Sequence, residues 1–351
     1  MEANVGTKPV AESHAFDVAA LQSHLEARLP GFAGPLTVEQ FKGGQSNPTY
    51  KLITPTQSYV MRSKPGPVAK LLPSAHAIER EFAVMGGLYG TDVPVPRMHL
   101  LCDDESIIGR AFYVMEFVEG RVLWEQSLPA FDKPGRAAIY DEMNRVIAAL
   151  HNVDVKAAGL EAYGKPGNYF ERQIGRWTKQ YQASITEPIE AMDRLIEWLP
   201  ANIPASARDD SQARIVHGDF RLDNLVFAAD EPRIVAVLDW ELSTLGHPLA
   251  DLAYNCLGYH MKEPPHGFAT VDFATLGLPT ESDYVAAYCR RTGRARIEHW
   301  NYYVAFSLFR LAAIAQGVYR RGLQGNSSNP ESVKMSKAPR ERAELAWSLV
   351  S

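Results

Sequence analysis

The sequence of 351 residues predicts an α+β fold with two lobes, a small N-terminal lobe with an antiparallel sheet and a helix, and a larger, mainly helical C-terminal lobe. Two observations lead to this prediction. Short apolar runs alternate with turn residues in the first third of the chain, as strands do. Farther along, apolar residues recur three or four positions apart, as helices do. We therefore assign residues 16–118 to the first lobe and 119–351 to the second, after a small, polar N-terminal tail at 1–15 that we expect to be disordered.

The small lobe is predicted to begin with a helix and a hairpin. Leucines recur at helical intervals over residues 16–29, and Pro30 stops the pattern. Strand-like runs follow at 50–53 and 58–62. The loop at 42–48 contains two glycines, which let a backbone approach closely, so its N–H groups can lie over phosphates. A plain turn explains that loop equally well when it is considered alone.

The rest of the small lobe is predicted to be a helix and a strand. Ser74 is a candidate N-cap for a helix that runs through Leu88, where Gly90 and two prolines follow. Residues 112–118 then form a strongly apolar strand that Glu116 interrupts. This strand closes the first lobe.

The second lobe is predicted to be helical from its start. One face of the segment 139–150 is apolar, and an aromatic-rich helical stretch follows at 169–181. Thr280 and Asp283 have the spacing of a capping box, which predicts that another helix begins there. The loop at 259–279 is long enough to suggest a functional flap.

Composition excludes several classes of protein. The chain is 46% hydrophobic and 22% charged, as in ordinary globular proteins, and its net charge of -5 gives no basic footprint for nucleic acid. Its three cysteines have neither disulfide nor metal-ligand spacing. No apolar run approaches the ~20 residues of a membrane span, and no basic, apolar leader opens the chain. We therefore expect a cytoplasmic protein with no nucleic-acid or membrane partner.

One motif points to phosphoryl transfer. His217, Gly218 and Asp219 are followed by Asn224, and Asp239 comes fifteen residues later. Transfer from ATP needs a carboxylate beside the attacking hydroxyl and ligands that hold Mg²⁺ against the phosphates. The Asp-x-x-x-x-Asn spacing matches the protein-kinase catalytic loop, where a later aspartate completes the metal site. The sequence therefore predicts a kinase.

Each motif residue also has a structural interpretation. Asp219 and Asn224 can be turn residues that bond to the local backbone, although the template spacing disfavours this. For His217 we favour packing under the loop over general-base chemistry, because Asp219 already fills that role. For Asp251 we favour a structural role near a helix start over metal binding.

With these residues the chain resembles the aminoglycoside phosphotransferase family, small-molecule kinases with a bilobal protein-kinase-like fold. The resemblance covers about residues 35–330 and is carried by 217–224, 239–241 and 246–253. More narrowly, three other runs look like the kinase domains that are fused to, or encoded beside, acyl-CoA dehydrogenases. These runs are 43–49, 71–77 and 112–121.

The resemblance implies a role for each motif residue. Asp219 is the catalytic base, and Asn224 and Asp239 are Mg²⁺ ligands. Glu81 anchors the basic residue that binds the ATP phosphates.

The resemblance also implies how the nucleotide is bound. The loop that contains Ser46 and Asn47 covers the phosphates. The backbone of Glu116 to Val118 forms the hinge that binds the adenine of ATP, with Met115 behind the ring.

The phosphate-binding residue departs from the kinase pattern. Where kinases have lysine on the third strand, this chain has Arg62, and Lys64 lies two residues on. Period-two alternation places both side chains on the same face of the strand. The register favours Arg62, which can bind phosphate bidentately but is not equivalent to lysine. Either residue can hold the phosphates.

Local charge points to an anionic acceptor. The segment 259–330 carries eight lysines and arginines against five acidic residues, although the whole chain is negative. A cationic aminoglycoside needs an acidic pocket, so this excess favours an anionic hydroxyl compound; solvated surface arginines explain it equally well. Helical spacing predicts four acceptor contacts on one helix: Arg310, Gln316, Tyr319 and Arg320. With the resemblance, this suggests a hydroxyacyl or hydroxyacyl-CoA acceptor and an association with an acyl-CoA dehydrogenase.

Two other functions compete with the small-molecule kinase. A catalytically silent pseudokinase that binds nucleotide or an acyl ligand is favoured only by arginine at the lysine position. A protein kinase is disfavoured because no Ala-Pro-Glu segment follows Asp239 and no room remains for an activation loop.

Overall fold

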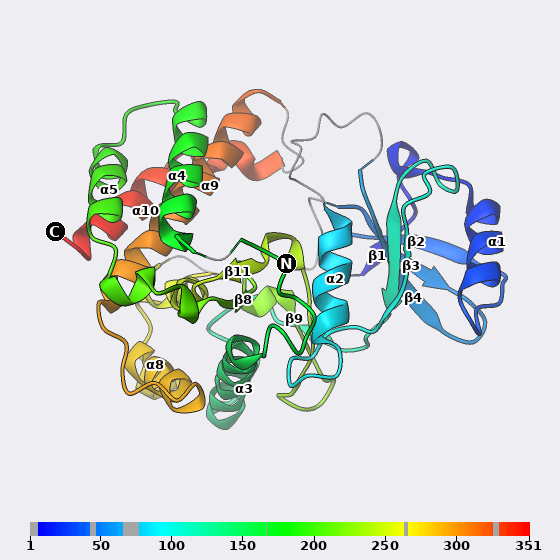
Figure 1. Cartoon of the computed structure of the whole chain (residues 1–351), viewed down its shortest axis with the longest axis horizontal. Helices are drawn as coiled ribbons and strands as arrows, with labels where there is room; N and C mark the ends of the chain where they lie inside the picture. The colour runs from blue at the N-terminus through cyan, green and yellow to red at the C-terminus, as the bar shows by residue number, and fades with distance from the viewer. Residues whose placement is uncertain (1–5, 43–46, 66–76, 166, 263–265, 326–329) are drawn as a thin grey trace. The chain divides into compact units, whose positions relative to one another are not determined.

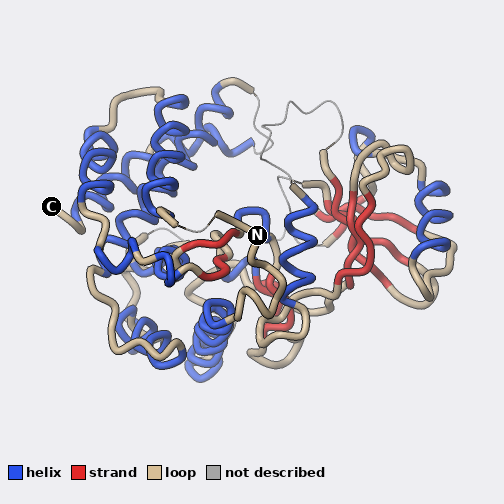
Figure 2. The backbone as a smooth tube through the Cα atoms, in the orientation of Figure 1, coloured by secondary structure: helices blue, strands red, loops and turns tan. Residues whose placement is uncertain are grey.

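The computed structural model describes residues 6–42, 47–65, 77–165, 167–262, 266–325 and 330–351. These residues form two compact units. Unit 1 comprises Met1–Val122, Ala158–Leu160 and Leu225–Glu241, and unit 2 comprises Leu123–Ala157, Glu161–Asn224 and Leu242–Ser351. Strands dominate unit 1 and helices dominate unit 2, which confirms the α+β class (Figure 2). The division differs from a single cut after residue 118, because two later segments return to unit 1.

Unit 1 is built on a six-stranded antiparallel sheet in the order β1-β2-β3-β4-β6-β5. Its strands are β1 (Thr7–Lys8), β2 (Thr37–Phe41), β3 (Thr49–Ile53), β4 (Ser58–Ser63), β5 (Met98–Cys102) and β6 (Phe112–Glu116). The predicted strands at 50–53 and 58–62 are therefore confirmed. In the central strand β4, Arg62 lies opposite Thr49 on one side and opposite Tyr113 of β6 on the other.

Two helices cover this sheet, one on each face (Figure 1). Helix α1 (Val18–Arg28) buries Leu21 and Leu25 in a core that includes Tyr50 and Met61 of the sheet. This confirms the leading helix. Helix α2 (Ile78–Leu88) contacts β5 and β6. It begins at an Ala77 N-cap that makes no side-chain hydrogen bond, so the predicted Ser74 cap is wrong; Ser74 itself lies outside the described residues.

The N-terminal segment is ordered where the structure describes it. Strand β1 pairs with β2, and the short helix Glu12–His14 follows. The His14 carbonyl accepts a hydrogen bond from Arg110 Nη2 at 2.6 Å. The expectation of disorder over residues 1–15 is therefore wrong for residues 6–15, and residues 1–5 lie outside the described residues. The physical reason is that β2 would otherwise present an open backbone edge, which β1 partly covers.

A second, three-stranded sheet completes unit 1. It joins β7 (Arg121–Val122), β9 (Leu225–Phe227) and β10 (Ile234–Val237) in the order β10-β9-β7. The Val237 N–H donates to the Pro94 carbonyl at 2.9 Å, which ties β10 to the segment before β5. This sheet carries Asp239 directly after β10.

Unit 2 is organised around α9 (Trp300–Leu323), a helix of 24 residues that is buried over most of its length. Its other helices are α3 (Lys133–Asn152), α4 (Tyr169–Ser184), α5 (Glu190–Ala201), α6 (Pro248–Asn255), α7 (Phe273–Leu276), α8 (Glu281–Arg291) and α10 (Ala338–Ser348). Helices α4, α6 and α10 pack against α9. The Thr280 hydroxyl accepts from the Asp283 N–H at 3.2 Å, which confirms the predicted cap of α8.

One short ladder in unit 2 positions the motif loop. Strands β8 (Arg214–Val216) and β11 (Thr244–Gly246) pair antiparallel, with Val216 opposite Thr244. The loop 217–224 leaves β8, and α6 follows β11, so both ends of the ladder lead into the candidate site. Within the described ranges, the structure contains no helix long and apolar enough to cross a membrane.

Candidate functional site

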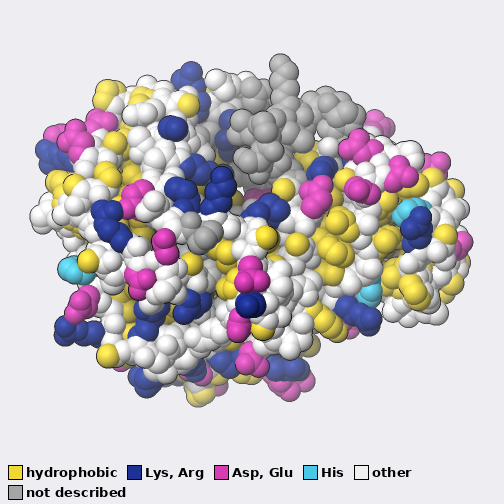
Figure 3. Space-filling model, in the orientation of Figure 1, with side chains coloured by type: hydrophobic (Ala, Val, Ile, Leu, Met, Phe, Trp, Pro, Cys, Tyr) yellow, Lys and Arg dark blue, Asp and Glu magenta, His cyan; other side chains and the backbone are white. Residues whose placement is uncertain are grey.

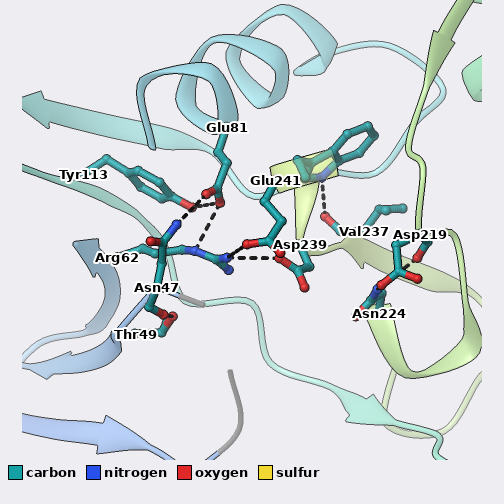
Figure 4. A network of polar contacts seen from close by, with 11 residues as sticks. Asn47, Thr49, Arg62, Glu81, Tyr113, Asp219, Asn224, Val237, Asp239 and Glu241 are labelled. Atoms are coloured by element: carbon teal, nitrogen blue, oxygen red, sulfur yellow. Dashed lines mark hydrogen bonds and ion pairs between the residues drawn. The ribbon is translucent and has the colours of Figure 1, made fainter. Parts of the chain in front are cut away.

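Arg62 is the centre of an ion-pair cluster in unit 1 (Figure 4). Its Nε lies 3.1 Å from Glu81 Oε2, and its Nη2 lies 3.0 Å from Asp239 Oδ1 and 3.5 Å from Glu241 Oε2. The Arg62 side chain is 12% exposed. Burial opposes its charge, but the surrounding acidic groups, Glu81 first, outweigh burial and raise its pKa above the ordinary value for arginine. The guanidinium is thus fixed in orientation and charged.

Glu81 is held in place by more than Arg62. It is 1% exposed, and its carboxylate accepts hydrogen bonds from Asn47 Nδ2 at 3.0 Å and from the Tyr113 hydroxyl at 3.1 Å. A buried carboxylate is stable only when its oxygens have such partners. The Asn47 side chain therefore positions Glu81, a contact that its place in the glycine-containing loop did not predict. Ser46, from the same loop, lies outside the described residues.

Lys64 has a different partner from Arg62. Its ammonium group pairs with Glu79, and the two side chains are 32% and 42% exposed. The structure thus directs the two candidate basic residues to two different glutamates of α2. Only Arg62 contacts both Glu81 and Asp239.

The segment after β6 is the predicted hinge. The Glu116 N–H donates to the Arg97 carbonyl at 2.9 Å, and the Glu116 carboxylate accepts from the Arg97 N–H at 3.1 Å. The Glu116 N–H and carboxylate are thus both engaged with the Arg97 backbone. Val118 follows β6 and is half-buried.

The motif loop in unit 2 is anchored by one buried carboxylate. Asp251 Oδ2 accepts from the His217 N–H at 2.7 Å, and its Oδ1 accepts from the Gly218 N–H at 2.8 Å. Gly218 has φ of +81°, and a Cβ there would lie 2.7 Å from the Leu242 carbonyl oxygen. Only glycine adopts this conformation against that neighbour without strain. The backbone of the loop is therefore restricted to this conformation at Gly218.

Asp251 belongs to a longer buried chain of polar groups. Its Oδ2 lies 3.3 Å from His151 Nε2, and His151 Nδ1 lies 2.8 Å from the Tyr288 hydroxyl. Burial raises the pKa of Asp251, but the contacts with His151 and His217 outweigh burial and lower it overall. The structural role expected for Asp251 fits this geometry, although the N-cap of α6 is His247.

Sequence reasoning missed His151. It lies 100 positions from Asp251, and its only local signal is one histidine near the end of a predicted helix. His217 has the packing role that we favoured: it is fully buried, and its Nδ1 accepts from the Asp219 N–H at 3.2 Å.

Asp219 and Asn224 are in contact within the loop. Asn224 Nδ2 donates to the Asp219 carbonyl at 2.9 Å and to Asp219 Oδ2 at 3.1 Å. Arg221 Nε lies 3.1 Å from Asp219 Oδ1, and Arg221 Nη2 lies 3.0 Å from Asp223 Oδ2. Both oxygens of the Asp219 carboxylate are thus oriented by neighbours. Because Asn224 uses its nitrogen here, its oxygen points elsewhere.

Asp239 is presented by an unusual backbone. It follows the buried strand β10, as predicted, and has φ of +63°, a conformation that aspartate tolerates better than most residues. Its side chain is 36% exposed. Among the described residues no group of three or more His, Cys, Asp or Glu is placed to hold a metal. The amide oxygen of Asn224 and the carboxylate of Asp239 are nonetheless the hard oxygen donors that Mg²⁺ takes, and Mg²⁺ characteristically uses few protein ligands and completes its shell with phosphate and water. Each donor is thus of a type that Mg²⁺ accepts, Asn224 in unit 2 and Asp239 in unit 1.

The four predicted acceptor residues lie on α9 but have different surroundings. Gln316 is 1% exposed, and its Nε2 donates to the Ser184 carbonyl at 2.8 Å and to Thr186 Oγ1 at 3.0 Å. Its donors are used inside the unit, so the acceptor contact expected of Gln316 is replaced by a packing role. Tyr319 is half-buried, Arg320 is exposed, and Arg310 is buried.

Known proteins with similar sequences include two mammalian relatives. The chain is 46% identical over 345 residues to acyl-CoA dehydrogenase family member 10 of Mus musculus, covering 97% of this chain and 32% of that protein. It is 43% identical over 356 residues to family member 11 of Rattus norvegicus, covering 99% of this chain and 45% of that protein. The chain therefore spans less than half the length of these relatives.

Solved structures resemble the whole chain. A Ralstonia eutropha JMP134 protein, whose own assignment as an aminoglycoside phosphotransferase is provisional, is 55% identical with a TM-score of 0.87, covering 95% of this chain and 98% of that one. A thermostable mutant of the aminoglycoside phosphotransferase APH(4)-Ia, solved with AMP-PNP and hygromycin B, is 16% identical with a TM-score of 0.60, covering 95% of this chain and 99% of that one. At that identity the likeness shows the fold, and it confirms the kinase-like fold class.

A family model also matches most of the chain. The model described as the phosphotransferase enzyme family matches residues 37–299, which is most of the chain and includes both the Arg62 cluster and the motif loop. The resemblance on which the predicted fold depended is thereby confirmed. This chain is a member of the phosphotransferase enzyme family of the aminoglycoside phosphotransferase type.

Proposed function

We propose that the protein is an ATP- and Mg²⁺-dependent phosphotransferase that acts on a hydroxyl group of a small molecule. The contact between Asn224 and Asp219 carries this proposal. The amide nitrogen orients the carboxylate at 3.1 Å, and we propose that the amide oxygen binds the cation. A kinase needs that combination, because positioning and charge stabilisation supply nearly all of its catalysis.

Asp219 is the proposed base. It orients the acceptor hydroxyl and takes its proton as the phosphoryl group is transferred. Its loop cannot shift freely, since Asp251 holds the two preceding N–H groups. Preorganisation of this kind lowers the cost of reaching the transition state.

The nucleotide is assigned to residues of unit 1. Arg62, held by Glu81, is the proposed phosphate ligand, and Lys64 is the alternative. The Glu116 carbonyl and the Val118 N–H are proposed to bind the adenine edge. The loop with Ser46 and Asn47 is proposed to cover the phosphates.

Asn224 and Asp239 are the proposed Mg²⁺ ligands. When bound, the metal would neutralise charge that develops on the phosphates. Arg62 Nη2 already contacts one oxygen of Asp239, so the second carboxylate oxygen is the one proposed for the cation.

For the acceptor we propose an anionic hydroxyl compound, such as a hydroxyacyl group or its CoA ester. The names of the two mammalian relatives and the positive charge of residues 259–330 support this choice. An association with an acyl-CoA dehydrogenase is part of the same proposal. Of the four α9 residues, Arg310, Tyr319 and Arg320 remain in the acceptor set.

One observation favours a second function. Arg62 stands where kinases have lysine and contacts the proposed metal ligand Asp239 at 3.0 Å. A pseudokinase that binds nucleotide or an acyl ligand without turnover would retain such a contact. The complete set of carboxylates weighs against this alternative.

The test is ADP formation by the full chain with Mg·ATP and a panel of hydroxyl compounds. The panel contains hydroxyacyl-CoA esters, free hydroxy acids, choline, amino sugars and homoserine. We expect turnover on one class, loss of turnover with EDTA and recovery with Mg²⁺. Asp219→Asn should lower kcat by about 10²–10⁴-fold. Mg·ATP binding with no turnover on any compound would instead support the pseudokinase.

A further inference from the structure

Arg310 is a buried cation without an acidic partner. It lies in the middle of α9 and is 7% exposed, and its Nε is buried and makes no hydrogen bond. In the part of the chain that the structure describes, no carboxylate forms an ion pair with it. Burying a charge in this way is unfavourable unless a partner arrives.

Two aromatic rings hold the Arg310 guanidinium in place. Its Cζ lies 5.4 Å from the centre of the Trp177 ring on α4 and 5.0 Å from that of the Tyr254 ring on α6. Such contacts are attractive and fix the plane of the group, but they neither neutralise its charge nor satisfy its N–H donors. Arg310 is therefore oriented, and its donors remain available.

Two further arginines belong to the same cluster. Arg176 on α4 has its Cζ 5.3 Å from the Trp177 ring. Desolvation, and then the nearby charge of Arg310, lowers its pKa, although its side chain is exposed at the surface. Arg342 lies on α10, which packs against α9, and is half-buried. Burial lowers the pKa of Arg342, and Tyr254 is the first of the groups that oppose this. Within the described residues neither arginine has an ion-pair partner.

Tyr254 connects this cluster to Asp219. The pKa of the Tyr254 hydroxyl is raised above its ordinary value by burial and next by the neighbouring Asp219 carboxylate. The same ring lies against Arg310, and α6, which carries Tyr254, also holds the loop of Asp219 through Asp251. Arg221 is also close, but it already pairs with Asp219 and Asp223.

Three other basic residues of the segment 259–330 have partners of their own. Arg291 pairs with Asp141, Arg296 pairs with Glu298, and Arg294 donates to Gln212. Arg310 differs from these three because it is buried and has no acidic partner among the described residues. Figure 3 shows lysine and arginine side chains gathered in the region of α4 and α9.

We propose that Arg310, Arg342 and Arg176 form an anion subsite that binds the carboxylate or phosphate group of the acceptor while its hydroxyl reaches Asp219. Three like charges from three helices, with no acid among them, are stabilised by an anion that accepts charge-assisted hydrogen bonds. This inference depends on the proposed function for the part that concerns the hydroxyl. Beyond the proposed function, it specifies where the acceptor is bound and which side chains bind it.

The experiment measures binding and turnover separately, on the full chain. Binding is followed by ligand-observed NMR without nucleotide, using 3-hydroxybutyrate as the carboxylate probe and glycerol 3-phosphate as the phosphate probe. The neutral diol 1,3-butanediol is the uncharged control. Turnover is followed as ADP formation with Mg·ATP and the same three compounds.

Four variants complete the design. Arg310→Met removes the charge and keeps the length of the side chain, and Arg310→Lys keeps the charge but removes the planar donor set. Arg342→Gln is a second, less buried change in case Arg310→Met folds poorly. Arg296→Gln is the matched control, because this arginine is exposed and its ion pair among the described residues is with Glu298.

We expect one of the two anions to bind more tightly than the diol. The anion that does so shows whether the charged group of the acceptor is a carboxylate or a phosphate. Arg310→Met should weaken this binding by about tenfold to a hundredfold, Arg310→Lys less, and Arg342→Gln by several-fold. Arg296→Gln should not change it. Added salt should weaken binding in the wild type, since the contact is ionic.

Two results overturn the anion subsite. One is that neither anion binds more tightly than the diol to the wild-type protein. The other is equal binding by Arg310→Met, Arg342→Gln and Arg296→Gln. Anion binding that depends on Arg310, with no ADP formed, retains the subsite and rejects the proposed function. Turnover on an anionic compound that is unchanged in Arg310→Met retains the kinase and rejects the subsite.

Discussion

Arg62 Nη2 lies 3.0 Å from Asp239 Oδ1, so a side chain of β4 contacts the residue that follows β10. The same guanidinium also reaches Glu81 of α2 at 3.1 Å. One arginine therefore joins three segments of unit 1 that lie far apart in the sequence. Its loss should affect stability as well as nucleotide binding.

Arg62→Met should lower the free energy of unfolding by about 3–5 kcal/mol, because it leaves the buried Glu81 carboxylate without its ion-pair partner. Urea denaturation measures this change. Lys64→Met is the matched control: its pair with Glu79 is largely exposed, and its loss should cost less than about 1 kcal/mol. Equal costs for the two variants would contradict the central role given to Arg62.

Asp239→Asn should separate activity from stability. The Asp239 side chain is 36% exposed, and Arg62 keeps Glu81 and Glu241, so the free energy of unfolding should change by less than about 1 kcal/mol. ADP formation should fall by at least about a hundredfold, because a metal ligand is weakened. Urea denaturation and a coupled ADP assay check both expectations. A fully active variant would remove Asp239 from the metal site.

Gly218→Ala should harm both folding and turnover. The φ of +81° and the approach to the Leu242 carbonyl oxygen leave no room for a Cβ, and we expect a cost of about 1–3 kcal/mol together with a displaced Asp219. The matched change is Gly86→Ala in α2, where a Cβ meets nothing within 4 Å. There alanine should stabilise the helix by about 0.5–1 kcal/mol. If both variants lose activity alike, the loop is not as constrained as its backbone indicates.

His247 should make stability depend on pH. Burial, then Arg294 and His151, lowers the pKa of His247 to about 3, so the folded protein keeps this ring neutral. The unfolded chain takes up a proton near pH 6.5, and stability must therefore fall as pH drops from about 6.5 toward about 3. The slope from this one group approaches about 1.4 kcal/mol per pH unit.

His247→Asn keeps a residue type suited to capping α6 and removes the titration. The fall in unfolding free energy between pH 6 and 4.5, measured in urea, should become shallower by nearly that slope. His299→Asn changes an exposed histidine and should leave the slope unchanged. If the slope in His247→Asn equals the slope in the wild type, the His247 ring is protonated in the folded wild-type protein.

Local patterns predicted the parts of this fold that depend on neighbouring residues. The leading helix, the strands at 50–53 and 58–62 and the Thr280 cap are set by periodicity and by short-range hydrogen bonds, and each is present. The loop from His217 to Asn224 was also evident, because the contact between Asp219 and Asn224 is made within it. Such features need no knowledge of what packs against them.

The parts that sequence reasoning missed depend on distant residues. Asp251 holds the motif loop from 34 positions away, and His151 supports Asp251 from a distance of 100 positions. Gln316 had helical spacing that suited a ligand, but its partners are the carbonyl of the last residue of α4 and the hydroxyl of Thr186, two residues later. The tail at residues 6–15 is polar enough to suggest disorder, yet the open edge of β2 gives it a place to pair.

The segment Leu225–Glu241 leaves one compact unit, contributes two strands to the other, and returns. Asn224 immediately precedes this excursion, and Asp239 lies near its end. No single cleavage or fusion point in the chain would therefore separate the two units intact, and neither can be exchanged between relatives as a continuous cassette. Recombination within the family is expected to succeed only when it carries residues 158–160 and 225–241 together with the first 122 residues. A recombinant built in this way takes the proposed metal ligand Asp239 from one relative and Asn224 from the other.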